Sequence, residues 1–211
     1  IIGYAVLLGI GNGYTPDSTN ILAIIDQNVL GADHLYHKSP IDPEGLTSTL
    51  AAIAHTLIGF CCGRIILAKE ALEQKTLKLF VAGFILMACG FVLTEALPLN
   101  KRIWSPTFVL VTCGFASLFL ALLIWIIDIN GKKKWTLFFE SFGINPLYLY
   151  VQGDILAVLL GMSGISAFMY MDLFRPIFGD FGGSLAWAIF FVVLNWIPGY
   201  FLYKKKIYIK L

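Results

Sequence analysis

Residues 41–50 read IDPEGLTSTL and run directly into an apolar segment that ends at Leu67. Asp42 and Glu44 thus stand one residue apart, just before a segment long enough to cross a bilayer. Carboxylates are costly within lipid but inexpensive at its boundary. This acidic segment (residues 41–50) therefore predicts the entrance of a polar cavity, with the rest of the chain as its wall.

A second interpretation of the acidic segment is purely structural. Asp42 and Glu44 can simply favour the positive end of a helix dipole. Pro43 can open the helix, and the hydroxyl of Thr47 or Ser48 can cap it. Both interpretations place these residues at the start of a membrane helix.

The composition indicates an integral membrane protein. Of 211 residues, 58% are hydrophobic and 13% are charged, whereas soluble domains carry about 25% charged residues. Apolar runs of about 20 residues favour helical spans. No basic patch with interleaved aromatic residues points to nucleic acid, and the four cysteines lie in apolar runs, where small buried side chains are expected. His34 and His37 have HxxH spacing beside Asp33, but a solvated loop is favoured and no metal site is predicted.

The predicted fold is all-α, a polytopic transmembrane helix bundle with about five full spans plus a truncated N-terminal span. Gly59 and Gly63 are spaced to let another helix approach the first full span. The Gly-rich stretch 161–181 is too broken to span, and 18–30 suits a short interfacial helix. Residues 1–211 are expected to form one transmembrane domain, the C-terminal part of a longer protein. The full spans are predicted at 47–67, 77–97, 107–127, 142–160 and 183–203, and the truncated one at 1–10.

Basic residues sort onto alternate loops. The loops after the first and third full spans, together with the tail, hold 11 of the 15 Lys and Arg residues. By the positive-inside rule these loops and the C-terminus are cytoplasmic. The acidic segment and the turn 98–106 then share the other side of the membrane.

The turn segment (residues 98–106) combines an amide, two cations and an indole at the membrane surface. Asn100 and Lys101 are suited to a phosphate or sugar, and Trp104 can stack on a sugar or adenine ring. The alternative is ordinary interfacial anchoring by Trp and Lys.

Polar residues also lie within or at the start of the spans. Asn145 either caps a helix or presents its amide to a ligand at the positive helix end. Asp154 lies near mid-membrane, where an acid is a functional candidate, although a helix-packing contact is the alternative. His55 and Asn195 also lie well inside predicted spans. A simple hydrogen bond to a neighbouring carbonyl or hydroxyl would account for a histidine at position 55 without a role in function.

Four motifs in order resemble one family. They are the acidic segment, Gly59 with Gly63-Arg64, the turn segment, and residues 143–151, reading GINPLYLYV. The chain is similar to the heparan-α-glucosaminide N-acetyltransferases and their bacterial relatives from about Gly31 onward. The family is thought to use a loop His near its N-terminal helices, and His34, His37 and His55 do not occupy that motif.

The resemblance implies a membrane enzyme that moves an acetyl group from acetyl-CoA, as co-substrate, to an amino sugar or glycan on the non-cytoplasmic side. By residue type, Asp42 and Glu44 are the candidate acid–base pair. Expected partners are the sugar and membrane lipids, with a homo-oligomer allowed, and the expected location is the bacterial inner membrane. The candidate binding residues are Asn100, Lys101, Trp104, Asn145 and Asp154.

Two other functions fit the same composition. A transporter or exporter of a sugar or lipid-linked sugar would use Asp154 and Asn195 to line a path at the midplane. A purely structural bundle would need its polar groups only for packing. Residues 152–154 read QGD where the human family member has GHE after the Tyr-Val pair, which bears on how closely the chemistry and substrate match.

Overall fold

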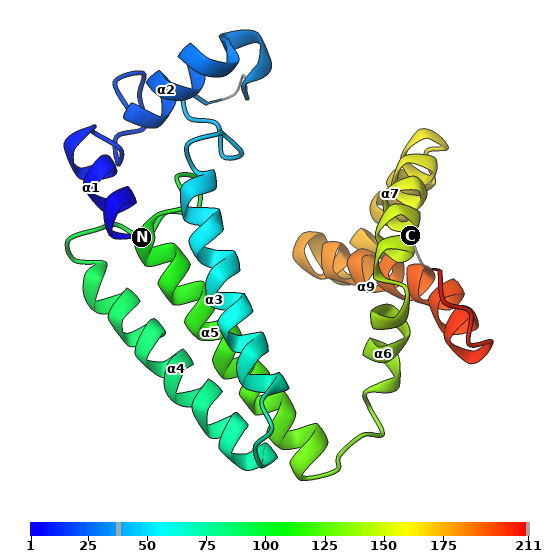
Figure 1. Cartoon of the computed structure of the whole chain (residues 1–211). Helices are drawn as coiled ribbons and strands as arrows, with labels where there is room; N and C mark the ends of the chain where they lie inside the picture. The colour runs from blue at the N-terminus through cyan, green and yellow to red at the C-terminus, as the bar shows by residue number, and fades with distance from the viewer. Residues whose placement is uncertain (37–38, 210–211) are drawn as a thin grey trace. The chain divides into compact units, whose positions relative to one another are not determined.

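A computed structural model describes residues 1–36 and 39–209, and within these ranges the chain folds into helices without strands (Figure 1). The polytopic helical fold predicted from the sequence is confirmed. The elements in order are α1 (Ile2–Ile10), α2 (Ile21–Leu30), the 3₁₀ turn η1 (Ala32–His34), α3 (Thr49–Leu67), α4 (Leu72–Leu93), α5 (Pro106–Ile124), the π-helical η2 (Trp125–Ile129), α6 (Leu137–Ile144), α7 (Pro146–Met162), α8 (Ile165–Phe168), the π-helical η3 (Met169–Phe174) and α9 (Arg175–Lys204).

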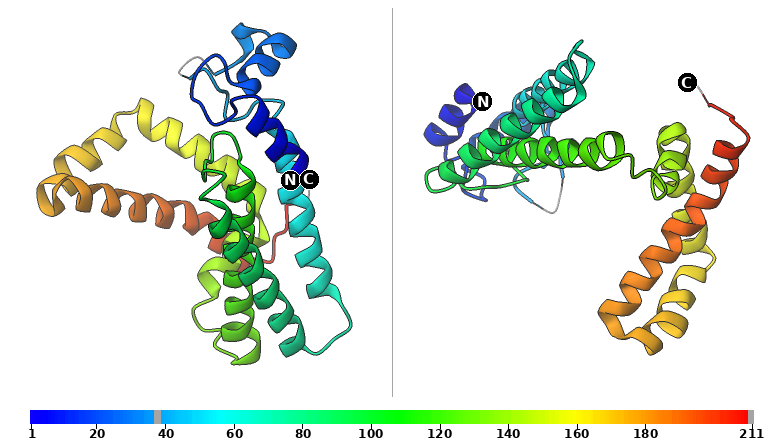
Figure 2. Two further views of the ribbon diagram at one scale, coloured as in Figure 1. Left: turned by 90° about the vertical axis from the view of Figure 1, so that its left-hand side faces the viewer. Right: turned by 90° about the horizontal axis from the view of Figure 1, so that it is seen from below.

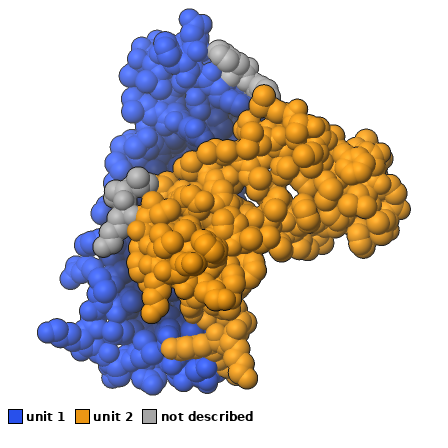
Figure 3. All heavy atoms as spheres, turned by 90° about the vertical axis from the view of Figure 1, so that its right-hand side faces the viewer, with its two compact units in different colours: residues 1–131 blue, residues 132–211 orange. Residues whose placement is uncertain are grey.

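Two compact units make up the chain, and each is described by itself. The first is Ile1–Gly131 and the second is Lys132–Leu211 (Figure 3). The expected organisation as one transmembrane domain within a longer protein stays a prediction.

Four helical segments of the described chain are long and apolar enough to cross a membrane. A fifth arises if α6 and α7, which are bent by 91° at their junction, count as one span. These numbers agree with the five predicted spans, while the apolar start of the chain forms only the short α1. The four segments are Thr49–Leu67, Leu72–Leu93, Pro106–Ile129 and Ile165–Lys204.

In the first unit α3, α4 and α5 run alongside one another, and α1 and α2 lie at the end where α3 and α5 begin (Figures 1 and 2). The second span begins at Leu72 rather than near residue 77. Its polar first turns are held by Lys78, whose ammonium lies 2.6 Å from Glu70, and by Lys75, which donates to the carbonyl of Ile66.

Glycines mediate the tightest helix contact, between α4 and α5. A Cβ added to Gly114 would lie 2.5 Å from the backbone nitrogen of Met87 and 2.7 Å from the carbonyl oxygen of Gly83. The close approach predicted at Gly59 and Gly63 is not found, because a Cβ at either position meets nothing within 4 Å. The two glycines line an open groove between α3 and α5 instead.

Gly114→Ala should therefore destabilise the first unit. The new methyl group collides with backbone atoms that cannot rotate away, at a cost of about 2 kcal/mol. A thermal unfolding curve of the protein in detergent should show a lower midpoint. Gly59→Ala is the matched control, since the methyl group enters open space and alanine is the better helix former. Equal midpoints for both variants would contradict the tight contact.

A sharp break separates α6 from α7 in the second unit. Pro146 lacks a backbone N–H and pushes the preceding residue out of the helical region; Asn145 accordingly has φ −130° and ψ 58°. The single span predicted at 142–160 was wrong in this respect, because residues before the proline form a helix of their own. Stretch 161–181 is helical over most of its length, because it holds the end of α7, α8, η3 and the start of α9, with interruptions of positive φ at Gly164 and Gly179. The last apolar segment therefore begins at Ile165 rather than near residue 183.

Candidate functional site

The acidic segment folds into a turn that uses Asp42 as a scaffold. One oxygen of its carboxylate accepts the backbone N–H of Glu44 at 2.8 Å, and the other accepts that of Tyr36 at 3.1 Å. The Asp42 carboxylate therefore stabilises the local backbone. The Glu44 side chain is exposed and makes no hydrogen bond or ion pair with the described residues.

The predicted helix cap was wrong. Helix α3 begins at Thr49, and no side chain caps it. The hydroxyl of Ser48 donates to the carbonyl of Gly45 at 2.8 Å, and that of Thr47 donates to Asp26 at 2.7 Å. Both hydroxyls thus fix the acidic segment rather than the first turn of the helix.

Asp26 of α2 is bonded to the acidic segment and was missed as a functional candidate. It is 1% exposed, and its Oδ1 accepts both the backbone N–H and the hydroxyl of Thr47. Its Oδ2 would lie 2.0 Å from a Cβ on Gly45, so only glycine fits there. The signal in the sequence was a carboxylate on the same helix face as Leu22 and Ala23, which are buried.

The loop before α2 contributes a neutral phenol to this end of the unit. Tyr14 packs against the apolar cluster that includes Leu22. Burial raises the pKa of the Tyr14 phenol, so this side chain stays neutral at physiological pH.

The turn segment is tied down by its own backbone. Asn100 accepts the N–H of Arg102 through its side chain at 2.9 Å, while its own N–H donates to the hydroxyl of Ser105 at 3.0 Å. Ile103 is fully buried, and its carbonyl accepts the hydroxyl of Tyr4 at 2.6 Å. The amide predicted to contact a ligand at Asn100 thus organises the turn, while the neighbouring side chains of Lys101 and Arg102 are exposed.

The acidic segment and the turn segment meet at one pocket of about 470 Å³. Glu44 comes from the first segment, and Lys101, Arg102 and Trp104 come from the second. Neither Asp42 nor Asn100 lines it. This entrance pocket is lined by Pro43, Glu44, Lys101, Arg102, Trp104 and Phe108.

Unpaired charges distinguish the entrance pocket. Within the described residues, the side chains of Glu44, Lys101 and Arg102 have no hydrogen-bond or ion-pair partner. Trp104 and Phe108 add aromatic surface, with ring centroids 6.4 Å apart. A carboxylate beside two cations and an aromatic wall can bind a sugar by stacking and accept a proton from its amine.

Trp104 connects this pocket to α3. Its backbone has φ +49°, a left-handed conformation that the tight turn imposes on a bulky residue. Its indole N–H donates to Nδ1 of His55 at 3.3 Å. The N–H of Trp104 is therefore occupied, and the partner of His55 is an indole rather than the carbonyl or hydroxyl expected.

Asn145 and Asp154 belong to the second unit, which is described by itself. The Asn145 side chain is buried and holds the tail: its Nδ2 donates to the carbonyl of Ile207 at 2.9 Å, and its Oδ1 accepts the N–H of Ile209 at 2.8 Å. It makes no capping bond to α7. Asp154 is exposed, while Asn195 accepts a hydrogen bond from Gln152 at 2.6 Å.

Asn145→Ala should release the tail. The N–H of Ile209 loses its acceptor, so its deuterium exchange should rise by about tenfold, the effect of one lost hydrogen bond. Hydrogen–deuterium exchange with mass spectrometry measures this on peptides that contain residues 205–209. Asn130→Ala is the control, because that amide bonds only the carbonyl of Trp125 in the first unit. Unchanged exchange in the Asn145 variant would contradict the clamp.

Metal ligands are not grouped in the described part of the chain, where no cluster of three His, Cys, Asp or Glu side chains is suited to a metal ion. His34 is exposed in η1, and His37 lies outside the described residues. All four cysteines are free thiols, and Cys61 and Cys89 are exposed.

Comparison with known proteins identifies relatives. The chain is 33% identical over 172 residues to heparan-alpha-glucosaminide N-acetyltransferase of Homo sapiens, a match that covers 72% of this chain and 26% of that protein. The protein of the same name from Mus musculus is 32% identical over 173 residues, again covering 26% of its length. The chain thus spans about a quarter of the curated relatives that it matches. No family model matches it.

Proposed function

Because the chain is homologous to one part of the heparan-α-glucosaminide N-acetyltransferases, we propose that it belongs to a membrane acetyltransferase. The donor in this proposal is acetyl-CoA, and the acceptor is an amino sugar or a glycan that carries one. The observation that supports it most strongly is the entrance pocket, where an unpaired carboxylate, two cations and an indole ring converge at one end of the helices.

Glu44 is the proposed base. An amino sugar arrives as an ammonium ion, and the Glu44 carboxylate accepts one of its protons. The free amine then attacks the carbonyl carbon of the thioester and forms the C–N bond of a tetrahedral intermediate, and the C–S bond breaks when this intermediate collapses. The proton still on that nitrogen neutralises the departing thiolate, and Glu44 passes its own proton to water. The products are the acetamide, CoA and one proton.

The other lining residues bind and orient. Trp104 and Phe108 offer aromatic surface to the apolar face of a sugar ring. Lys101 and Arg102 are placed to attract an acidic glycan and to stabilise the oxyanion of the tetrahedral intermediate. The two neutral structural amides, Asn100 and Asn145, keep their roles in the turn and the tail.

The proposed topology places the entrance pocket on the non-cytoplasmic face. Basic residues gather at the opposite end of α3 and α4 and in the tail, which favours a cytoplasmic C-terminus. The protein is proposed to lie in the bacterial inner membrane, with lipids as neighbours along its exposed apolar helices.

An acetyl-transfer assay tests the proposal. The full-length protein, purified into lipid nanodiscs, is mixed with radiolabelled acetyl-CoA and glucosamine, and N-acetylglucosamine is measured by chromatography. Labelled product above a protein-free control is expected. Binding of CoA without turnover of glucosamine or any other amino sugar would overturn it. Uptake of sugar into proteoliposomes in the absence of CoA would indicate a transporter instead.

A further inference from the structure

A groove between α3 and α5 leads away from His55 and plays no part in the proposed chemistry so far. Its volume is about 290 Å³. On α3 the lining runs from His55 to Ile66, which spans about 16 Å of helix. Gly59 and Gly63 keep the groove open, because nothing lies within 4 Å of where their side chains would begin.

The hydrogen bond from Trp104 determines where His55 carries its proton. An indole N–H can only donate, so Nδ1 of His55 must be the acceptor and carries no hydrogen. The proton of the neutral ring then lies on Nε2. His55 is thereby fixed as a hydrogen-bond donor and cannot act as a base through Nε2.

This donor is unsatisfied. Nε2 of His55 has no partner among the residues that the structure describes, and the ring lines a groove that is mostly apolar. A free N–H at the depth of a membrane span is costly, and it is satisfied by an acceptor that arrives on an apolar chain. A carbonyl group on an acyl chain has this chemistry.

We propose that the α3/α5 groove binds the acyl-bearing arm of the thioester donor, with Nε2–H of His55 donating to its carbonyl oxygen. This rests on the proposed acetyltransferase function. His55 contacts Trp104, which also lines the entrance pocket, so a carbonyl at His55 lies beside the acceptor site.

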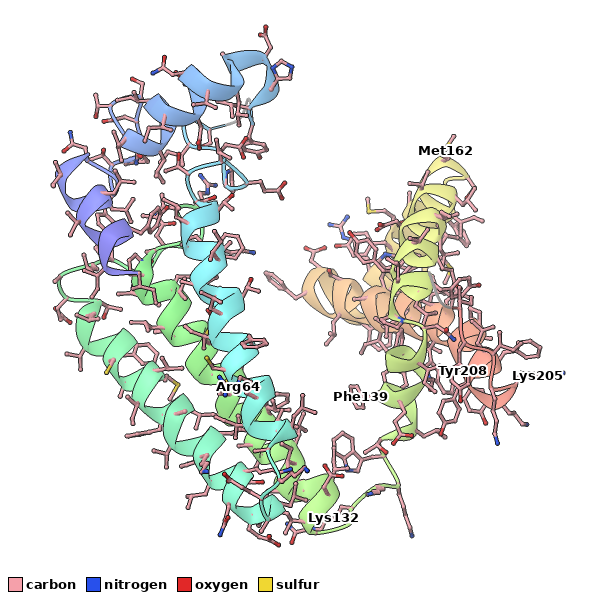
Figure 4. The ribbon with its side chains drawn as sticks, in the orientation of Figure 1. Arg64, Lys132, Phe139, Met162, Lys205 and Tyr208 are labelled. Carbon is pink, nitrogen blue, oxygen red and sulfur yellow. The ribbon has the colours of Figure 1, made fainter. Side chains whose placement is uncertain are left out.

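Charge at the far end favours this donor over a neutral lipid. Arg64 lies in the last turn of α3 (Figure 4) and lines the neighbouring pocket with Glu70 and Lys78. Cations outnumber acids at this end, because Arg64, Lys69, Lys75 and Lys78 stand against Glu70 and Glu73. The phosphates of a CoA thioester would lie at this basic end when its acyl group reaches His55. Arg64 has no partner among the described residues, which leaves its guanidinium available.

Two substitutions separate the two nitrogens of His55. His55→Gln places an amide N–H near the position of Nε2, and His55→Asn places an amide oxygen near that of Nδ1. His55→Asn should keep the bond to Trp104 but weaken binding of acetonyl-CoA, an unreactive ketone analogue, by about tenfold, as expected for one lost hydrogen bond. His55→Gln should bind this analogue within a few-fold of the wild type.

The test uses the full-length protein in nanodiscs, with calorimetry for acetonyl-CoA and ¹⁵N NMR of labelled histidine. The His55 resonances, identified by their loss in His55→Gln, should show a hydrogen on Nε2 and shift when acetonyl-CoA is added. Wild-type affinity in His55→Asn, or a hydrogen on Nδ1, would overturn the inference. A shift that follows added lipid but not acetonyl-CoA would overturn it in favour of a lipid occupant.

The failure of this inference is separable from that of the proposed function. Acetyl transfer with full activity in His55→Asn would leave the acetyltransferase standing and remove the role of His55. Binding of acetonyl-CoA that depends on His55, without any acetylated sugar, would support the groove and remove the acceptor chemistry.

Discussion

Glu44→Gln is expected to lower kcat for acetyl transfer by about 100-fold or more, the usual contribution of a general base. The amide keeps the size of the side chain but cannot accept a proton. Because the Glu44 side chain makes no hydrogen bond or ion pair with the described residues, its replacement should leave the fold intact. Rates of N-acetylglucosamine formation at saturating acetyl-CoA provide the measurement.

Glu95→Gln is the matched control for this prediction. Glu95 is also an exposed acid, in the loop between α4 and α5, and it does not line the entrance pocket. This variant should turn over like the wild type. If both variants lost activity equally, a general effect of negative charge at this end of the helices would replace the proposed base.

Asp26→Ala should give the largest loss of stability. It leaves the N–H and the hydroxyl of Thr47 buried without an acceptor, which costs about 2–4 kcal/mol. The acidic segment should loosen as a result, so acetyl transfer should fall together with the unfolding midpoint. Thermal unfolding in detergent and the acetyl-transfer assay measure the two effects.

A control and a graded variant sharpen the prediction for Asp26. Asp33→Ala removes an exposed acid from η1 and should change stability by less than about 0.5 kcal/mol. Thr47→Val removes one of the two donors and should fall between the control and Asp26→Ala. A midpoint for Asp26→Ala that matches the Asp33 control would show that this buried carboxylate does not hold the segment.

The meeting of the acidic segment with the turn segment could be predicted from the sequence. Two successive spans, α3 and α4, separate Glu44 from Trp104 and return the chain to the same side, so both residues had to lie at one end. The alternation of apolar and basic stretches was enough to predict the side of the membrane on which each loop lies, without any detail of packing.

Which residue of each segment stabilises the backbone and which one lines the pocket could not be predicted. Asp42 and Glu44 have the same chemistry and nearly the same position in the sequence, yet one holds backbone N–H groups and the other faces a pocket. Likewise Asn145 could cap a helix or meet a ligand by residue type, and its actual partner is the distant tail. Such choices depend on the loop geometry, which periodicity does not encode.

The glycine spacing on α3 did not predict its packing. Gly59 and Gly63 match a close-packing motif, but no neighbouring atom lies within 4 Å of a Cβ at either position. At the close contact between α4 and α5, each helix contributes a glycine, namely Gly83 and Gly114. Glycine spacing on one helix therefore predicts that another helix could approach closely, but it does not predict which helix does so.

The glycine contact between α4 and α5 also limits where molecules can travel. Backbone lies against backbone at Gly83 and Gly114, and not even a methyl group fits between them. Water, ions and solutes are thereby excluded from this seam. A reagent attached at Gly83 or Gly114 would therefore have to force the two helices apart, whereas one attached at Gly59 or Gly63 would enter open space.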